Sequence, residues 1–130
     1  MRHMIPADQD SSAGSDRQTQ LLRGALDMCL LALLSDDAAH GYELVRRVAA
    51  AGFDGVGYGT VYPLLTRMRR LGLVADELQA SPTGPPRKVY ALTEAGHARL
   101  HAWRRQWVHF VGLVDTTLAN SATDLPRSSS

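Results

Sequence analysis

The chain has 130 residues, 45% of them hydrophobic, and a formal net charge of +1. This length is enough for one domain with a modest core. The single cysteine, Cys29, excludes a disulfide framework and a cysteine zinc site, and its apolar surroundings in sequence predict a buried, unreactive thiol. The N-terminal residues lack the apolar segment of a signal peptide, and no apolar run reaches the about 20 residues that span a bilayer. We therefore expect a soluble, cytoplasmic protein with no membrane partner.

Positive charge is unevenly distributed along the chain. Residues 1–39 carry three arginines against six aspartates, a balance of −3. Residues 40–73 carry five arginines against two acidic residues (+3), and residues 87–105 carry five basic residues against one glutamate (+4). These clusters favour a polyanionic partner. The alternative, in which the arginines only solvate helix faces, stays open at this point.

The sequence predicts four parts. Residues 1–18 and 121–130 are polar and lack a hydrophobic period, so we expect a disordered N-terminal arm and a disordered tail. Residues 19–92 read as a folded domain and residues 93–120 as a C-terminal helix.

The first two helices are expected at residues 20–34 and 41–51. The first is apolar nearly all round, which predicts burial on several sides and a partner subunit that covers part of it. The second follows His40, which we place at its entry, and ends at Gly52, which suits the left-handed position after a helix.

A third helix is expected to start near Thr60, with this hydroxyl as its cap and Pro63 at the third helical position. One face forms an apolar stripe, made of Val61, Leu64, Leu65, Met68 and Leu71. The other face is polar and basic, and presents Tyr62, Pro63, Thr66, Arg67 and Arg70. Arginine can pair bidentately with guanine, and hydroxyl groups reach phosphates or bases, so this face is typical of a helix that reads duplex DNA.

Two strands, 74–79 and 87–92, follow the third helix and form a hairpin whose tip is residues 81–86. Arg87 and Lys88 are placed for contacts with a phosphate backbone. Thr93 then caps the last helix. The predicted fold is mostly α with a small two-stranded β-wing, that is, a winged helix-turn-helix followed by a C-terminal dimerisation helix.

The last helix, expected to end near residue 119, carries apolar residues that alternate at spacings of three and four. With two residues of the first helix they form our predicted dimer interface: Leu26, Leu30, Leu100, Trp103, Trp107, Phe110, Val114 and Leu118. In the alternative, this seam folds back on its own domain. Trp103 and Trp107 could in addition line a pocket for a small planar aromatic effector, because indole rings stack well on such compounds.

No motif points to catalysis, a cofactor or a metal. His97 and His101 are spaced as a two-histidine metal pair, but no nearby acidic or thiol ligand completes a site. No nucleophile elbow and no cysteine–histidine couple is present. The glycines of residues 52–59 lack the flanking strand and Gly-Lys-Ser/Thr of a nucleotide loop. We therefore predict a protein that is not an enzyme.

Five segments in fixed order, L-L-R-G-A-L-D-M-C-L-L-A-L-L, H-G-Y-E-L, T-V-Y-P-L-L-T-R-M, G-L-V and G-P-P-R-K-V-Y-A-L-T-E-A-G, resemble the PadR family of bacterial transcriptional regulators. The resemblance covers residues 22–118 and implies a homodimeric winged-helix repressor that leaves double-stranded DNA when it meets an effector. The single C-terminal helix looks like the short-tailed branch of that family.

The resemblance assigns DNA contact to Thr60, Tyr62, Pro63 and Arg67, and to Arg87 and Lys88 of the wing. In some short-tailed relatives a tryptophan of the last helix lines a flat pore between subunits and stacks on planar drugs, and Trp107 occupies the similar position. The resulting hypothesis is a repressor that binds a palindromic operator as a homodimer. Two alternatives stay open: a winged-helix module that binds protein, and a small-molecule sensor with weak DNA contact.

Overall fold

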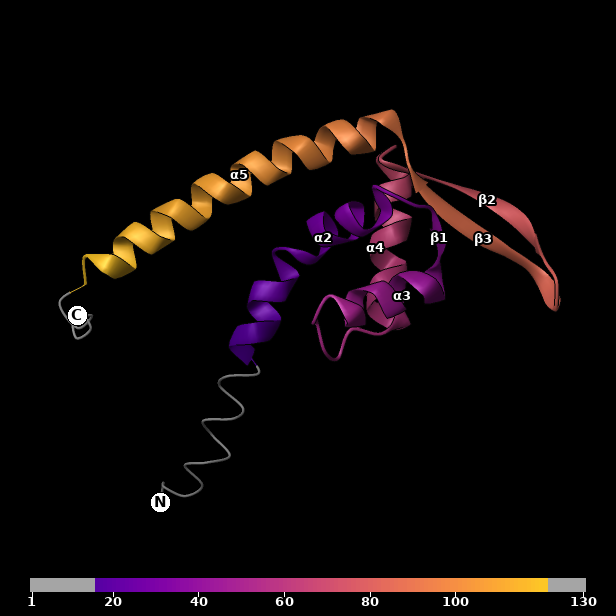
Figure 1. Cartoon of the computed structure of the whole chain (residues 1–130), viewed down its shortest axis with the longest axis horizontal. Helices are drawn as coiled ribbons and strands as arrows, with labels where there is room; N and C mark the ends of the chain where they lie inside the picture. The colour runs from indigo at the N-terminus through magenta and orange to yellow at the C-terminus, as the bar shows by residue number, and fades with distance from the viewer. Residues whose placement is uncertain (1–15, 122–130) are drawn as a thin grey trace, which may run out of the picture.

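Helices α2, α3 and α4 share one apolar core with a small antiparallel sheet, and a long helix, α5, leaves that core and projects away from it (Figure 1). The structure is a computed structural model that describes residues 16–121. In chain order its elements are α2 (Leu26–Leu34), β1 (Ala39–His40), α3 (Gly41–Ala50), α4 (Tyr58–Arg70), β2 (Val74–Ser81), β3 (Gly84–Leu92) and α5 (Glu94–Ala119). The mostly helical winged architecture agrees with the sequence prediction.

Helix α2 is the centre of the core. Four of its leucines, Leu26, Leu30, Leu31 and Leu34, are almost fully buried, against α3, β3 and the start of α5. Its own chain therefore covers these four leucines. The placement of Leu26 and Leu30 in a dimer interface is wrong, and so is that of Leu100, because all three are 5% exposed or less inside this core.

The predicted first helix is broken in two. Residues 16–23 are helical, a turn follows at Gly24 and Ala25, and α2 then begins at Leu26. Residues 16–18, which we had placed in the disordered arm, therefore belong to a helix. The rest of that arm and residues 122–130 of the predicted tail lie outside the described residues.

The sheet has three strands in the order β1-β3-β2, one more than expected. The additional strand, β1, pairs Ala39 with Tyr90 and His40 with Val89. A two-residue strand leaves no hydrophobic alternation in sequence, so only pairing with β3 identifies it.

The β2–β3 hairpin is the wing, and it is longer than predicted. Its strands pair as far as Ser81 and Gly84, so the turn is only Pro82 and Thr83. Pro85 and Pro86 lie in β3, not in the tip. Proline is tolerated there because β1 pairs only with Val89 and Tyr90, which leaves this end of β3 with an unpaired edge.

Helix α3 begins after His40 and ends before Gly52, as the sequence predicted, and the side chain of His40 is in addition its N-cap. The ring nitrogen Nδ1 of His40 accepts from the backbone N–H of Glu43, at 3.1 Å. Gly52 has φ +107°, and the N–H groups of Gly52 and Phe53 donate to the carbonyls of Ala49 and Val48. This is the hydrogen-bond pattern of a glycine-terminated helix.

Helix α4 starts earlier than predicted. It begins at Tyr58 after Gly57, which offers no side-chain cap, so Thr60 lies inside the first turn and caps nothing. Pro63 is consequently the sixth helical residue, not the third, and it leaves the carbonyl of Gly59 without its usual donor. Leu71 closes the helix as its C-cap and is 52% exposed, so it does not belong to the buried stripe.

Thr93 fastens the start of α5 to the end of α4. Its hydroxyl oxygen accepts from the N–H of Gly96 at 3.0 Å, and the hydroxyl donates to the carbonyl of Gly72 at 2.7 Å. The cap predicted from sequence is confirmed. A side chain at Gly96 would collide with the carbonyl of Leu73, so the backbone of α5 at Gly96 packs directly on the backbone of Leu73. No helix among residues 16–121 is both long and apolar enough to cross a membrane.

Thr93→Ala should lower the free energy of unfolding by about 1–2 kcal/mol, because it removes both the helix cap and the hydrogen bond to Gly72. Urea denaturation followed by circular dichroism measures this loss. Thr93→Ser keeps the hydroxyl and is the control. Equal stability of the alanine and serine variants would contradict the role of the hydroxyl.

Candidate nucleic-acid interface

Helix α4 has an apolar side that faces the core and a polar side that faces solvent. Val61, Leu65 and Met68 are buried in the core, each no more than 2% exposed. Most residues predicted for DNA contact lie on the solvent side of the helix: Thr60, Tyr62, Pro63, Arg67 and Arg70 are exposed, and Thr66 is half-buried. The structure therefore brings the predicted residues of this helix together on one accessible surface.

No carboxylate in the described part of the chain neutralises the basic side chains of α4. Arg67, Arg69 and Arg70 are exposed and make no hydrogen bond or ion pair with any of residues 16–121. The arginines of α3 differ, because Arg46 pairs with Glu43 and Arg47 pairs with Glu43 and Asp37. The guanidinium groups of α4 are therefore available to an anionic partner, whereas those of α3 are not.

Three tyrosines form a stacked ladder across the N-terminal ends of α3 and α4. The ring centroids of Tyr42 and Tyr58 are 4.5 Å apart, and those of Tyr58 and Tyr62 are 5.4 Å apart. Burial, and next the neighbouring Tyr42 and Tyr62, raise the pKa of the Tyr58 phenol. The two outer rings remain exposed, so the ladder presents two phenol groups beside the exposed face of α4.

The ladder depends on a glycine. A Cβ atom at Gly41 would lie 2.5 Å from Cε1 of Tyr58. Only a residue without a side chain lets the Tyr58 ring lie this close to the start of α3. The glycine of the H-G-Y motif therefore has a packing role, and the tyrosine that follows it, Tyr42, joins the candidate interface.

The two basic residues predicted for the wing already have partners within the chain. Nη1 of Arg87 lies 2.6 Å from Nε2 of His40, and Nη2 reaches the hydroxyl of Ser81 at 3.5 Å. Nζ of Lys88 lies 3.6 Å from a carboxylate oxygen of Asp76 on β2. Both side chains are exposed, so these contacts are open to exchange with solvent anions.

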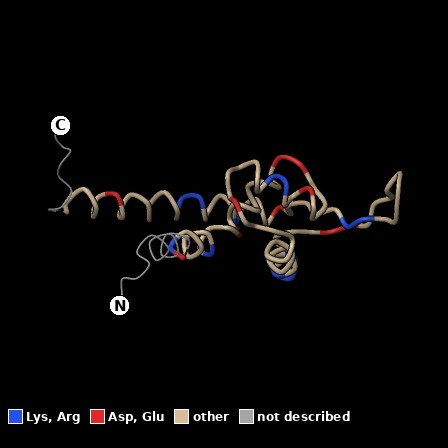
Figure 2. The backbone as a smooth tube through the Cα atoms, turned by 90° about the horizontal axis from the view of Figure 1, so that it is seen from below, with Lys and Arg blue, Asp and Glu red and all other residues tan. Residues whose placement is uncertain are grey.

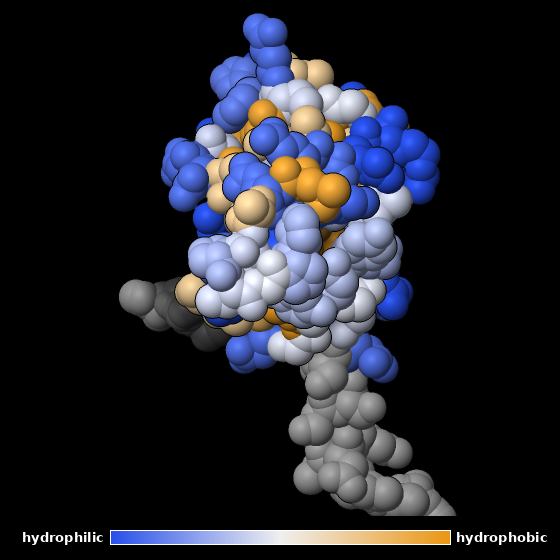
Figure 3. All heavy atoms as spheres, turned by 90° about the vertical axis from the view of Figure 1, so that its right-hand side faces the viewer, coloured by the Kyte–Doolittle hydropathy of each residue, from blue (hydrophilic) through white to orange (hydrophobic). Residues whose placement is uncertain are grey.

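On the wing and on α5, most charged residues lie in the half that is nearer to the helical core (Figure 2). Residues 79–86 at the wing tip carry no charge, and the outer part of α5, residues 106–119, carries only Asp115. The end-on view of the wing shows a largely hydrophilic surface with small apolar areas (Figure 3).

His40 connects three elements at the base of the wing. It is the last residue of β1, it caps α3 and it contacts Arg87 of β3. Burial, and next the positive charge of Arg87, hold the pKa of this imidazole below its usual value of 6.5. The strand that carries His40 is held by Arg47, which donates to the backbone carbonyls of Leu33, Asp37 and Ala38.

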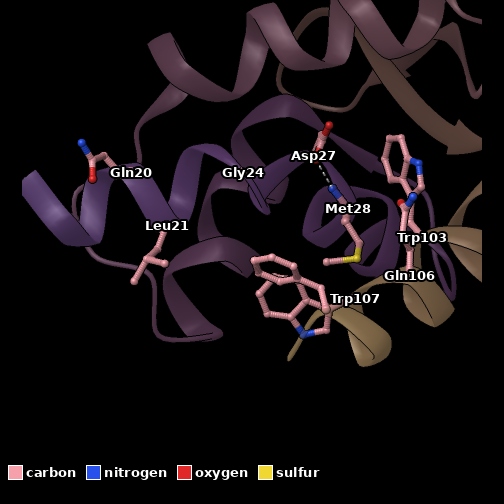
Figure 4. Close-up of a pocket in the computed structure, with 9 residues that line it drawn as sticks. Gln20, Leu21, Gly24, Asp27, Met28, Trp103, Gln106 and Trp107 are labelled. Atoms are coloured by element: carbon pink, nitrogen blue, oxygen red, sulfur yellow. Dashed lines mark hydrogen bonds between the residues drawn. The ribbon is translucent and has the colours of Figure 1, made fainter. Parts of the chain in front are cut away.

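Two hollows border the outer part of the molecule. The first, of about 590 Å³, lies between the segment 20–28 and α5, with Trp103, Gln106 and Trp107 on the α5 side (Figure 4). The second, of about 710 Å³, also includes Trp107 and reaches Cys29 and Phe53. Both tryptophans predicted for an effector site therefore line a hollow large enough for a small aromatic molecule.

Cys29 is half-buried on the wall of the second hollow. Burial, and next the nearby Asp27 carboxylate, raise the pKa of its thiol, which keeps it protonated and poorly nucleophilic.

The outer half of α5 exposes a set of large apolar side chains. Trp107, Val108, Phe110, Leu113, Val114 and Leu118 are each at least 38% exposed. Trp107 and Phe110 line a hollow beside the segment 20–28, whereas the other four line neither hollow, and α5 diverges from the core (Figure 1). The predicted seam is thus divided: Leu100 is buried, Trp103 is half-buried, and the residues from Trp107 onward face solvent.

Among residues 16–121 no group of three His, Cys, Asp or Glu residues is placed to hold a metal ion. His97 and His101 are exposed on α5.

Sequence reasoning missed Tyr42, Tyr58 and the contact of His40 with Arg87. A signal was present in the tyrosine spacing, because Tyr58 and Tyr62 are four residues apart and so share a helix face. That face became visible only once α4 was known to begin at Tyr58. No sequence pattern indicated that β1 would bring His40 against Arg87.

A basic, solvent-exposed helix that follows a helix and a tight turn, with a β-hairpin beside it, defines a winged helix-turn-helix DNA-binding protein. Comparison with known proteins specifies the family. Residues 30–102 match the Transcriptional regulator PadR-like family. The chain belongs to this family of DNA-binding transcriptional regulators.

Individual relatives agree in sequence and in fold. A transcriptional regulator of Mycobacterium tuberculosis is 36% identical over 83 residues, which cover 64% of this chain and 76% of that protein. The crystal structure of a PadR family regulator from Eggerthella lenta superimposes with a TM-score of 0.82 at 31% identity, and covers 88% of this chain and all of that one. A PadR-like regulator from Bacillus cereus gives a TM-score of 0.70 at 35% identity, covering 78% and 99%.

The lowered pKa of His40 predicts how stability depends on pH. Above pH 6.5 the ring is neutral in both the folded and the unfolded chain. As the pH falls below 6.5, the unfolded chain takes up the proton first, so the free energy of unfolding decreases until the folded pKa is passed.

The measurement is a series of urea denaturation curves between pH 7.5 and pH 5. In His40→Asn, which keeps a capping acceptor but does not titrate, the decrease should be smaller. Identical pH profiles for the two proteins would contradict the assignment.

Proposed function

We propose that the chain is a repressor that binds a palindromic operator as a homodimer, with α4 in the major groove and the wing on the flanking backbone. The observation that carries the proposal is the set of arginines on the exposed face of α4 that have no partner among residues 16–121. A helix of this kind in a winged domain supplies base contacts, whereas the wing supplies phosphate contacts that position it. Such a protein acts in the cytoplasm, where bacterial DNA is located.

The contacts on α4 fall into two kinds. Arg67 and Arg70 are long enough to reach base edges and can pair with guanine through two hydrogen bonds. Thr60, Thr66 and the phenols of Tyr42 and Tyr62 offer hydroxyl groups to phosphates. Pro63 adds a rigid apolar contact on the same face. In the wing, Arg87 and Lys88 exchange their internal partners for phosphates.

A homodimer is supported by the apolar surface of α5. Six large apolar side chains exposed on a single helix are far more than a monomer normally leaves in water. The occupant that fits this surface is the same helix of a second copy, because a symmetric pair buries both surfaces at once. Of the residues predicted for the interface, Trp107, Phe110, Val114 and Leu118 remain in this proposal, with Trp103 at its inner edge.

A small planar aromatic effector is supported by the hollow beside Trp103 and Trp107. Indole rings stack on flat aromatic molecules, and Met28 adds a polarisable apolar wall. Because Trp107 belongs to the proposed dimer surface, a ligand there would alter how the two subunits pack and so the spacing of the two α4 helices.

Gel-shift titration with the DNA upstream of the protein's own gene tests the DNA contacts. Arg67→Ala should weaken specific binding about tenfold or more, because one bidentate base contact contributes about 1–3 kcal/mol. Arg87→Ala should weaken binding to all duplexes alike. With six phosphate contacts per dimer, log K should fall with log salt at a slope of about −5.

Arg104→Ala, an exposed arginine on α5, is the matched control and should bind as the wild type does. Wild-type affinity in both Arg67→Ala and Arg87→Ala would refute this mode of binding. A failure to shift any DNA would instead favour a winged-helix module that binds protein.

Sedimentation equilibrium tests the dimer. Phe110→Asp should convert the protein to a monomer, because a carboxylate in an apolar helix pair loses its hydration. Leu78→Asp is the control: Leu78 is an exposed leucine of the wing, and its loss should leave the dimer intact. A monomeric wild-type protein at micromolar concentration would contradict the proposal.

Titration with proflavine in the absence of DNA tests the effector site. The dye should quench tryptophan emission in the wild type, and Trp107→Ala should abolish the spectral shift of the bound dye. Unchanged dye binding in Trp107→Ala would place the site elsewhere or exclude it.

A further inference from the structure

Two hydrogen-bond donors compete for one lone pair at His40. The N–H of Glu43 donates to Nδ1 at 3.1 Å, and Nη1 of Arg87 lies 2.6 Å from Nε2. A neutral imidazole has one acceptor nitrogen and one N–H, and a guanidinium group only donates. A single neutral tautomer therefore satisfies either the cap of α3 or Arg87, never both.

Each state of the ring has a definite consequence. With the proton on Nε2, the ring caps α3 and turns an N–H toward the guanidinium of Arg87, which has no acceptor to offer. With the proton on Nδ1, the ring accepts from Arg87 and the N–H of Glu43 loses its acceptor. A doubly protonated ring is a donor on both sides and repels Arg87.

We propose that His40 is a positioning residue for the wing. In the free protein its Nε2 accepts from Arg87 and holds this side chain against β1. When a DNA phosphate binds the guanidinium, Nδ1 accepts from the N–H of Glu43 instead, and Nε2–H points toward the phosphate. The proposal rests on the contact between Arg87 and DNA proposed above. It makes His40 the link between the wing and the N-terminal end of α3, and thus between two parts of the interface.

The charges around the ring determine its response to protons. Arg87 faces it from β3, and Glu43, Arg46 and Arg47 face it from α3. Arg46 is paired with Glu43, and Arg47 with Glu43 and Asp37, so two carboxylates balance these two arginines and the guanidinium of Arg87 is the unbalanced charge beside the ring. When a phosphate takes this guanidinium and adds its own negative charge, protonation of His40 becomes easier. DNA binding therefore takes up a proton, and affinity rises as the pH falls.

The first test is the tautomer itself, read from the ¹⁵N chemical shifts of the His40 ring in the free protein and bound to the DNA upstream of its own gene. In the free protein at pH 7.5 the expected result is a proton on Nδ1, with Nε2 accepting from Arg87. In the complex, Nε2 is protonated. The same tautomer in both states would overturn the proposal.

The second test compares pH profiles of DNA affinity at fixed salt. The wild type should bind about 3- to 10-fold more tightly at pH 5.5 than at pH 7.5, since one unit of pKa shift corresponds to a tenfold change. His40→Asn can cap α3 without titrating and should change less than about twofold over the same range. His101→Asn, an exposed histidine of α5, is the matched control and should follow the wild type. Circular dichroism at each pH confirms that the proteins stay folded.

A third variant separates capping from the hold on Arg87. His40→Asp also caps α3, but its permanent charge retains Arg87, so it should bind DNA more weakly than His40→Asn at pH 7.5. Equal affinity of the two variants would overturn the proposal.

A failure of this inference can be distinguished from a failure of the proposed function. If Arg87→Ala binds DNA as the wild type does, the wing contact of the proposed function is wrong and this inference falls with it. If Arg87→Ala weakens binding while His40→Asn keeps the wild-type pH profile, only the role of His40 is wrong.

Discussion

The burial of α2 is the constraint on which the rest of the structure depends. Four leucines on a nine-residue helix are removed from water by α3, β3 and the start of α5. At about 25 cal/mol per Å² of apolar surface, leucine burial of this extent contributes several kcal/mol, a large share of a small domain's net stability. Helix α4 shares this core, packs on α3 and β2, and keeps its basic side for solvent, while α5 leaves the domain beyond Trp103.

Charge within the winged domain is divided by function. Arginines that fix the architecture are paired: Arg47 holds three backbone carbonyls and two carboxylates, and so fixes the approach of β1 to β3. Arginines on the exposed face of α4 have no such partners among the described residues. Arg87 is intermediate, since a neutral histidine is a partner that a phosphate displaces readily. The arginines that hold the fold together thus have several partners within the chain, and those assigned to DNA contact have a weak partner or none among the described residues.

The outer part of α5 is apolar where the winged domain is basic. Of its exposed apolar side chains, Trp107 and Phe110 line the hollow beside the segment 20–28, and Trp107 also lines the second one. Trp107 therefore belongs both to the exposed apolar surface and to the two hollows.

The sequence by itself determined those features that depend on local chemistry. Alternation of apolar and polar residues identified the solvent side of α4, and Gly52, Thr93 and His40 marked helix ends correctly, because caps and left-handed turns are satisfied by residues next to them in the chain. The order of five motifs was specific enough to indicate the family. What the sequence could not determine was the fate of Leu26, Leu30 and Leu100, because an apolar helix looks the same whether its own chain or a partner covers it. Only the tertiary structure decided that, and only it brought β1 to β3 and His40 to Arg87, since these contacts join residues 47 to 51 positions apart and leave no local pattern.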